Sequence, residues 1–219
     1  MKQATRAIRP DDFRERLDAW YGLHGREFPW RQTRDPYRIL VSEILLHRTR
    51  AEQVLPVYDQ FIDEFPTPAD IARKSRRVRS LLKPLGLHWR TDLLLDMARD
   101  LELRFGGAVP DDRESLRSLP GVSDYISEAV RCFAFGRPAV LLDTNITRVV
   151  GRIEGLPVND SARRNSRFRK ELQRLLPSGR SRNAYLALID LGAAVCRPAH
   201  PSCPRCPFRE LCKYAASID

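Results

Sequence analysis

Four cysteines stand close together near the C-terminal end of the chain. They are spaced CX6CX2CX5C and comprise Cys196, Cys203, Cys206 and Cys212. Four prolines interrupt residues 196–212, so we expect the thiols in one compact loop that wraps an inorganic centre. Four thiolates satisfy either a tetrahedral zinc ion or an iron–sulfur cluster. The single CX2C pair differs from a paired zinc ribbon, which favours iron–sulfur and leaves zinc open. Cys132, in the apolar stretch RCFAF, is predicted to be a small core residue.

A second group of residues could bind an anion and supply a carboxylate. In LRSLPGVSDYISEAV, Pro120 and Gly121 predict a turn between two helices. Glycine lets a backbone approach a phosphate closely, and amides at the next helix N-terminus bind the anion without reading sequence. LPGV is also compatible with an ordinary helix connection. Further along, Asp143 directly precedes the helical pattern TNITRVVGRI, where an aspartate can cap the helix.

A third candidate is a carboxylate in an apolar environment. Glu43 interrupts the run ILVSEILL, where an ionised side chain is costly unless it is paired or partly solvated. It points either to solvent or into a polar pocket. His47 and Arg48 follow about one helical turn later, and His47 could equally be a histidine on a helix surface.

The elements that position these residues are helical. Apolar residues recur at three- and four-residue intervals in 36–65 and 90–105, and proline and glycine divide the chain into roughly ten helices. Only short stretches such as PAVLL could be strands. The sequence therefore predicts an all-α protein.

Charge and composition indicate the class of partner. The formal net charge is +10 at pH 7, and all but five of the 38 basic residues are arginine. Arginine binds phosphate through planar, bidentate contacts, which suits nucleic acid better than a membrane, although a genome-wide codon bias would give the same composition. The chain has no apolar run of about 18 residues and no apolar signal-peptide core near its N-terminus. We expect a monomeric protein in the cytoplasm, associated with the nucleoid.

The cysteine spacing and the LPGV hairpin together resemble the endonuclease III and MutY branch of the helix-hairpin-helix DNA glycosylases. The resemblance implies a [4Fe–4S] cluster on the four cysteines, chiefly structural and facing DNA. Basic residues that interleave the ligands fit a loop that faces phosphate, namely Arg197, Arg205, Arg209 and Lys213.

The same resemblance implies the fold and its domains. We expect an all-α helix-hairpin-helix glycosylase fold, with a DNA-binding cleft between a helical barrel domain and a [4Fe–4S] cluster domain. The six-helix barrel would cover residues 27–138, with the hairpin at about 113–130. The cluster domain would combine residues 1–26 with 139–219, and its cluster loop would be residues 196–212. The hairpin residues Gly121, Val122 and Ser123 are then expected to dock the phosphates of double-stranded DNA.

The resemblance also implies the type of reaction. Asp143 corresponds to the family's catalytic aspartate, whose carboxylate stabilises positive charge on the sugar or orients water. Bifunctional relatives carry a lysine after the hairpin that forms a Schiff base, and Tyr125 stands at that position. A phenol cannot form this adduct. We therefore expect a monofunctional base-excision glycosylase without Schiff-base lyase activity.

The block REFPWRQTRDPYRILVSEILLHRTRAEQV resembles the archaeal Mig-type glycosylases that act on T/G and U/G mismatches. This implies that Glu43 and Tyr125 shape a catalytic pocket for the flipped base. His47 and Arg48 would fill the gap that the base leaves in the duplex. The chain departs from the family pattern at Ser123, where glycine is usual, and at His47, where Mig-type enzymes tend to have arginine.

Two other functions remain open at this point. MutY adenine glycosylases, which act opposite 8-oxoguanine, share the block and the glutamate, but they commonly have serine where Tyr125 stands. The other hypothesis is a DNA-binding protein without catalytic activity that carries an iron–sulfur cluster.

Overall fold

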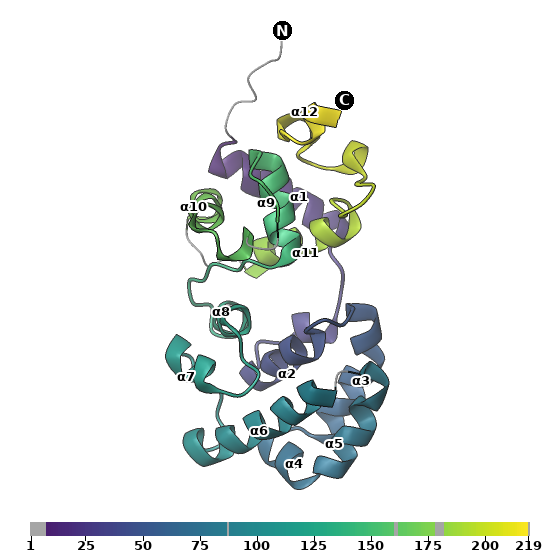
Figure 1. The fold of residues 1–219 in the computed structure, drawn as a ribbon, viewed down its shortest axis with the longest axis vertical. Coiled ribbons are helices and arrows are strands. Elements are labelled where there is room, and N and C mark those ends of the chain that lie inside the picture. The colour runs from purple at the N-terminus through teal and green to yellow at the C-terminus, as the bar shows by residue number, and fades with distance from the viewer. Residues whose placement is uncertain (1–7, 87, 160–161, 178–181, 219) are drawn as a thin grey trace. The chain divides into compact units, whose positions relative to one another are not determined.

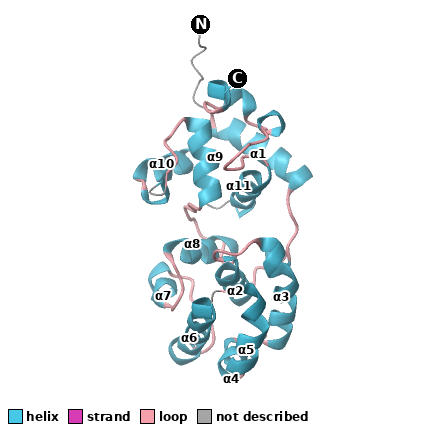
Figure 2. Cartoon of the chain, turned by 45° about the vertical axis from the view of Figure 1, so that its right-hand side comes forward, coloured by secondary structure: helices cyan, strands magenta, loops and turns pink. Residues whose placement is uncertain are grey.

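The structure is a computed structural model that describes residues 8–86, 88–159, 162–177 and 182–218. Within these residues every regular element is helical, and Figure 2 shows helices joined by loops, with no strand. The all-α prediction is confirmed. In the described part of the chain, no helix combines the length and apolar character needed to cross a bilayer.

The chain divides into two compact units. Unit 1 comprises the described parts of Met1–Arg26 and Pro138–Asp219, and unit 2 is Glu27–Arg137 without residue 87. Unit 1 is therefore built from both ends of the sequence.

Unit 2 is organised around one buried helix. Helix α2 packs against α3, α6 and α8, and Ile39, Leu40, Val41 and Leu45 are almost completely buried on it. Asp35 caps this helix by accepting hydrogen bonds from the backbone of Tyr37 and Arg38. The elements of unit 2 are η1 (Pro29–Arg31), α2 (Pro36–Leu46), α3 (Ala51–Glu64), α4 (Pro68–Arg73), α5 (Ser75–Leu82), η2 (Lys83–Leu85), α6 (His88–Phe105), α7 (Arg113–Ser118) and α8 (Asp124–Phe133).

Unit 1 is centred on α11, which packs against α1 and α9 (Figure 1). Helices α9 and α11 approach each other closely at Gly192. A Cβ on this residue would lie only 2.6 Å from the Cβ of Asn145. The elements are α1 (Pro10–His24), α9 (Thr144–Glu154), η3 (Ala162–Arg164), α10 (Ser166–Leu175), α11 (Arg182–Ala194), η4 (Cys203–Arg205), η5 (Arg209–Leu211) and α12 (Ala215–Ile218).

Two contacts attach the N-terminal helix to distant parts of unit 1. The rings of Phe13 and Phe208 stack with centroids 4.9 Å apart, and Arg16 donates to the Pro207 carbonyl at 3.0 Å. At the end of the same N-terminal segment, Arg26 pairs with the fully buried Asp190 of α11 at 2.7 Å. A buried carboxylate needs such a partner, so the pair fixes the N-terminal segment to α11.

Candidate functional site

The hairpin of unit 2 has the turn that its sequence predicts. Helix α7 ends at Ser118, α8 begins at Asp124, and Gly121 between them has a φ of +78°. A side chain is strained at this φ, and a Cβ at Gly121 would also lie 3.1 Å from the Cβ of Leu93. The N–H of Val122 donates to the Leu119 carbonyl at 3.1 Å, which closes the turn. That amide is therefore engaged inside the hairpin.

Ser123 has a clear local role. Its hydroxyl oxygen accepts a hydrogen bond from the N–H of Ile126 at 3.2 Å, which makes it the N-cap of α8. A glycine at this position could not supply that side-chain cap. The departure from the family pattern thus stabilises the helix that carries Tyr125.

Tyr125 and Glu43 lie on helices that pack against each other. Tyr125 is in the first turn of α8, and Glu43 is in the second half of α2. Both residues are partly exposed, while their neighbours Ser42, Ile44 and Ile126 are buried. Unit 2 therefore brings together the two helices on which the pocket residues were expected.

The turn between α2 and α3 holds His47 and Arg48. Both are exposed, and Arg48 adopts a left-handed conformation with a φ of +60°. For a residue with a Cβ this conformation costs roughly 1–2 kcal/mol and persists only where the surroundings hold it. The restraint comes from Arg90 of α6, which donates to the Leu45 and His47 carbonyls at 2.7 and 2.9 Å.

Asp143 is the N-cap of α9 in unit 1. Its carboxylate accepts hydrogen bonds from the backbone N–H of Ile146 at 2.7 Å and from Nδ2 of Asn145 at 3.0 Å. Burial raises the pKa of the Asp143 carboxyl above its ordinary value, although these hydrogen bonds and the charge of Arg148 act in the opposite direction. The carboxylate is fixed in orientation and only partly hydrated.

Arg148 connects the Asp143 cap to the cysteine segment. Its Nη2 donates to Oδ1 of Asn145 at 2.7 Å and to the Gly192 carbonyl at 2.8 Å. Its Nε donates to the Cys196 carbonyl at 2.6 Å. The residue is 8% exposed. A single buried guanidinium thus ties the residue that orients Asp143 to the first cysteine of the loop.

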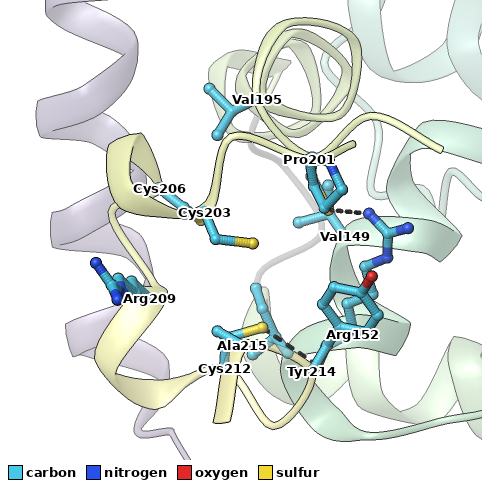
Figure 3. Close-up of a pocket in the computed structure, with 12 residues that line it drawn as sticks. Val149, Arg152, Val195, Pro201, Cys203, Cys206, Arg209, Cys212, Tyr214 and Ala215 are labelled. Atoms are coloured by element: carbon cyan, nitrogen blue, oxygen red, sulfur yellow. Dashed lines mark hydrogen bonds between the residues drawn. The ribbon is translucent and has the colours of Figure 1, made fainter. Parts of the chain in front are cut away.

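The four cysteines line one space in unit 1, which we call the cysteine pocket. It has a volume of about 20 Å³ and is partly open to solvent, and Val149, Val195 and Tyr214 are among the residues that complete its wall. Figure 3 shows the sulfur atoms of Cys203 and Cys212 directed toward it. The four cysteines that were predicted to share one centre therefore line a common space.

The charges around the cysteine pocket indicate what kind of group it could hold. Burial, together with the charges of the other three cysteines, raises the pKa of the Cys206 thiol to about 12. Arg152 donates to Sγ of Cys196 at 3.5 Å. Among the described residues, no three His, Cys, Asp or Glu side chains are placed to hold a single metal ion.

Sequence reasoning missed the arginines that organise these sites. Arg90 and Arg148 are 3% and 8% exposed, and their acceptors lie more than 40 residues away along the chain, apart from the local contacts of Arg148. The available signal for Arg148 was an arginine in a largely apolar stretch, ITRVV, where an unpaired charge would be costly.

Comparison with known proteins assigns the family. Residues 41–177 match the model of the HhH-GPD superfamily base excision DNA repair proteins. A thymine-DNA glycosylase from Aeropyrum pernix is 36% identical over 94% of this chain and 95% of its own. A thymine/uracil-DNA glycosylase from Methanothermobacter thermautotrophicus is 37% identical over 86% of each chain. The solved structure of a thermostable thymine-DNA glycosylase superposes with a TM-score of 0.88 at 34% identity, covering 95% of this chain and 97% of the other. The chain therefore belongs to the HhH-GPD superfamily of base excision DNA repair proteins.

Proposed function

We propose that this chain is a monofunctional DNA glycosylase that hydrolyses the N-glycosidic bond of thymine or uracil mispaired with guanine. The observation that carries the proposal is Asp143, a carboxylate held at the N-terminus of α9 by two hydrogen bonds. The names of the two archaeal relatives support the choice of base, since each similarity covers most of both chains.

Asp143 acts on the sugar. Cleavage of a glycosidic bond develops oxocarbenium character, and an ionised carboxylate fixed nearby stabilises that charge or orients the attacking water. The Ile146 N–H and the positive end of α9 favour the ionised form, while burial opposes it. The ionised carboxylate, held in this environment, is poorly screened by water.

Tyr125 and Glu43 act on the extruded base. A hydroxyl and a carboxylate on two packed helices can donate and accept hydrogen bonds at the edge of a pyrimidine. Tyr125 has no amine and cannot form a Schiff base with the sugar, so the product is an abasic site on an intact strand.

The hairpin and the α2–α3 turn bind the duplex. Gly121 lets the backbone of the hairpin approach a phosphate, and the exposed Ser123 adds a hydroxyl at the N-terminus of α8. His47 and Arg48, presented by the turn, occupy the gap that the base leaves. The protein acts as a monomer on double-stranded DNA.

The cysteine pocket fits a [4Fe–4S] cluster. The donor set is all cysteine, and the four cysteines line one pocket, as the ligands of a single cluster must. Cys196, Cys203, Cys206 and Cys212 would hold the cluster, which would crosslink the loop and supply positive charge that favours the thiolate forms. Arg152 and Arg148 bind the first cysteine of the loop and orient it.

A panel of duplexes tests the choice of substrate. Oligonucleotides that contain T·G, U·G, T·A or A·8-oxoguanine are incubated with excess protein, and released bases are quantified by chromatography. We expect thymine and uracil from the two guanine mismatches and no thymine from T·A. Adenine release from A·8-oxoguanine alone would show a MutY-type enzyme, and duplex binding without release of any base would show a non-catalytic DNA-binding protein.

A further inference from the structure

Helix α10 exposes a group of basic side chains at the edge of unit 1 (Figures 1 and 2). Phe168, Leu172 and Leu175 are buried, so one side of the helix packs on α1 and α9 while the opposite side faces solvent. The exposed residues include four cations that we call the α10 basic face, namely Arg164 in η3 and Arg167, Arg169 and Lys170 in α10. Unit 1 therefore presents a dense positive charge on the side of α10 that points away from α9.

Carboxylates do not balance the charge of the α10 basic face. Glu171 is the one acidic residue of α10, and Arg174 binds it at 2.7 Å. Arg174 also pairs with Glu154 of α9 at 2.8 Å, so both carboxylates at this helix are already engaged. In the described part of the chain, no carboxylate forms an ion pair with any of the four cations.

Helix α5 shows how the chain balances a similar sequence. Its sequence is SRRVRSLL, and Arg77 and Arg79 pair with Glu64 of α3 and Asp92 of α6. Such pairs offset the repulsion between like charges on a helix surface. Within the described residues the α10 basic face lacks this compensation, and Arg167 also lies in the first turn, where the positive end of the helix disfavours a cation. A bound polyanion would remove both costs.

The other exposed side chains around the α10 basic face narrow the choice of polyanion. The exposed residues between 164 and 173 are all polar, and the uncharged ones are Asn165, Ser166 and Gln173. A membrane site would need apolar side chains to insert, and a protein interface is usually centred on aromatic or other large anchors. Single-stranded DNA would be held by aromatic rings that stack on its bases. Arginine, amide and hydroxyl groups without aromatic rings match the phosphate backbone of a duplex.

The α10 basic face is separate from the proposed catalytic carboxylate. Phe168 contacts α9 at Gly151, where an added Cβ would lie 3.0 Å from the Phe168 ring. Gly151 is about two helical turns, or ~12 Å, along α9 from Asp143. The cations lie on the far side of α10, a further helix diameter of about 10 Å away. This spacing is that of a second surface and not of another wall of the same site.

We propose that the α10 basic face binds the phosphate backbone of a second segment of duplex DNA while a first segment occupies the site at Asp143. The contact reads no sequence, because it involves phosphates and not base edges. It lets the protein pass from one segment to another without first dissociating, which shortens the search for a mismatch. The inference goes beyond the proposed function and does not depend on the release of a base.

Simultaneous binding of two duplexes tests the proposal. The protein is saturated with a short duplex that carries a stable abasic-site analogue opposite guanine, and an undamaged duplex with a different fluorophore is then added. Sedimentation velocity, followed at both fluorophores, should detect a complex of one protein with both duplexes. The triple variant Arg167→Gln, Arg169→Gln and Lys170→Gln should bind the second duplex roughly 10- to 100-fold more weakly and keep its affinity for the first. Because these side chains are exposed, its Tm should match that of the wild type.

A charge-matched variant separates this surface from the net charge of the protein. Arg9→Gln, Arg99→Gln and Arg104→Gln together also remove three positive charges, but each of these arginines pairs with a nearby aspartate. This control should bind the second duplex as the wild type does. A wild-type protein that never holds two duplexes overturns the proposal, as does an equal loss in the control. A loss of affinity for the first duplex in the triple variant would place the α10 basic face on the substrate duplex, which also overturns it.

Dissociation kinetics measure the transfer itself. The protein is loaded on a fluorescent duplex that contains the abasic-site analogue and is chased with increasing concentrations of the undamaged duplex. The dissociation rate of the wild type should rise with the concentration of the chase, whereas that of the triple variant should stay constant. A wild-type rate that does not depend on the concentration of the chase would overturn the proposal. A protein that releases no base from any mismatch would refute the proposed function and leave this result unchanged.

Discussion

Replacing Asp143 with Asn separates two roles of one side chain. The Asp143 carboxylate caps α9 through the Ile146 N–H, and we propose that its charge stabilises the developing sugar cation. An Asn side chain is an equally good N-cap because its amide oxygen accepts the same hydrogen bond. The substitution therefore removes the charge while keeping the cap.

The structure gives the magnitude for each role. An amide oriented for the cap directs its NH₂ toward Asn145 and loses the 3.0 Å hydrogen bond, which is worth about 1 kcal/mol. In the other direction, a carboxyl whose folded-state pKa is raised by burial destabilises the fold when it is ionised, and the neutral amide removes this cost. Because these two effects oppose each other, Asp143→Asn should not lower the free energy of unfolding by more than ~1 kcal/mol, which corresponds to a fall in Tm of at most roughly 2–4 °C. Base release should fall about 100- to 1000-fold.

The assay compares single-turnover thymine release from a T·G duplex with thermal unfolding of the same protein preparations. Asp35→Asn is the matched control, since Asp35 caps α2 through Tyr37 in the same way and lies outside the proposed site. We expect the control to keep wild-type activity. If Asp143→Asn releases thymine within threefold of the wild-type rate, Asp143 is only a helix cap and the catalytic assignment is wrong.

Three further predictions concern unit 1. Burial raises the pKa of Asp143, and catalysis needs its ionised form. The rate of base release should therefore fall as the pH decreases through a value above the ordinary aspartate pKa of about 3.9, and a rate that stays constant down to pH ~4 would contradict this. Arg148→Gln breaks a buried hydrogen-bond network and should cost about 3–5 kcal/mol, seen as a fall in Tm of roughly 6–20 °C, whereas an unchanged Tm would show that the network is dispensable. Cys206→Ser should lose iron and sulfide measured on the purified protein, while Cys132→Ala, at a buried cysteine outside the cysteine pocket, should retain both; stoichiometric zinc without iron in the wild type would exclude the cluster.

Short sequence patterns were sufficient to predict the local conformations that do not depend on tertiary contacts. Gly121 in LPGV predicted the turn between two helices, and it has the positive φ that favours glycine. Asp143 before TNIT predicted an N-cap, and the cap is present. Both features depend on the conformation of a few consecutive residues, so spacing and residue type were sufficient.

The contacts that position the site could not be predicted in this way. Arg90 and Arg148 bind backbone carbonyls of other elements, and backbone carbonyls are the same in every residue type. The stack of Phe13 on Phe208 joins opposite ends of the chain, and helical periodicity only shows that each ring lies on an apolar face. Ser123 was noted as a departure from the family, and its capping role required the geometry of α8.

The most direct test of the central claim, hydrolysis without a covalent intermediate, is the fate of the DNA strand after a T·G duplex meets the wild-type protein. Free thymine, strand integrity with and without alkali, and adducts trapped by borohydride are measured in the same reaction. We expect free thymine, strand breaks only after alkali, and no trapped adduct, because Tyr125 has no amine to attack the sugar. Strand breaks before alkali together with a trapped protein–DNA adduct would contradict it.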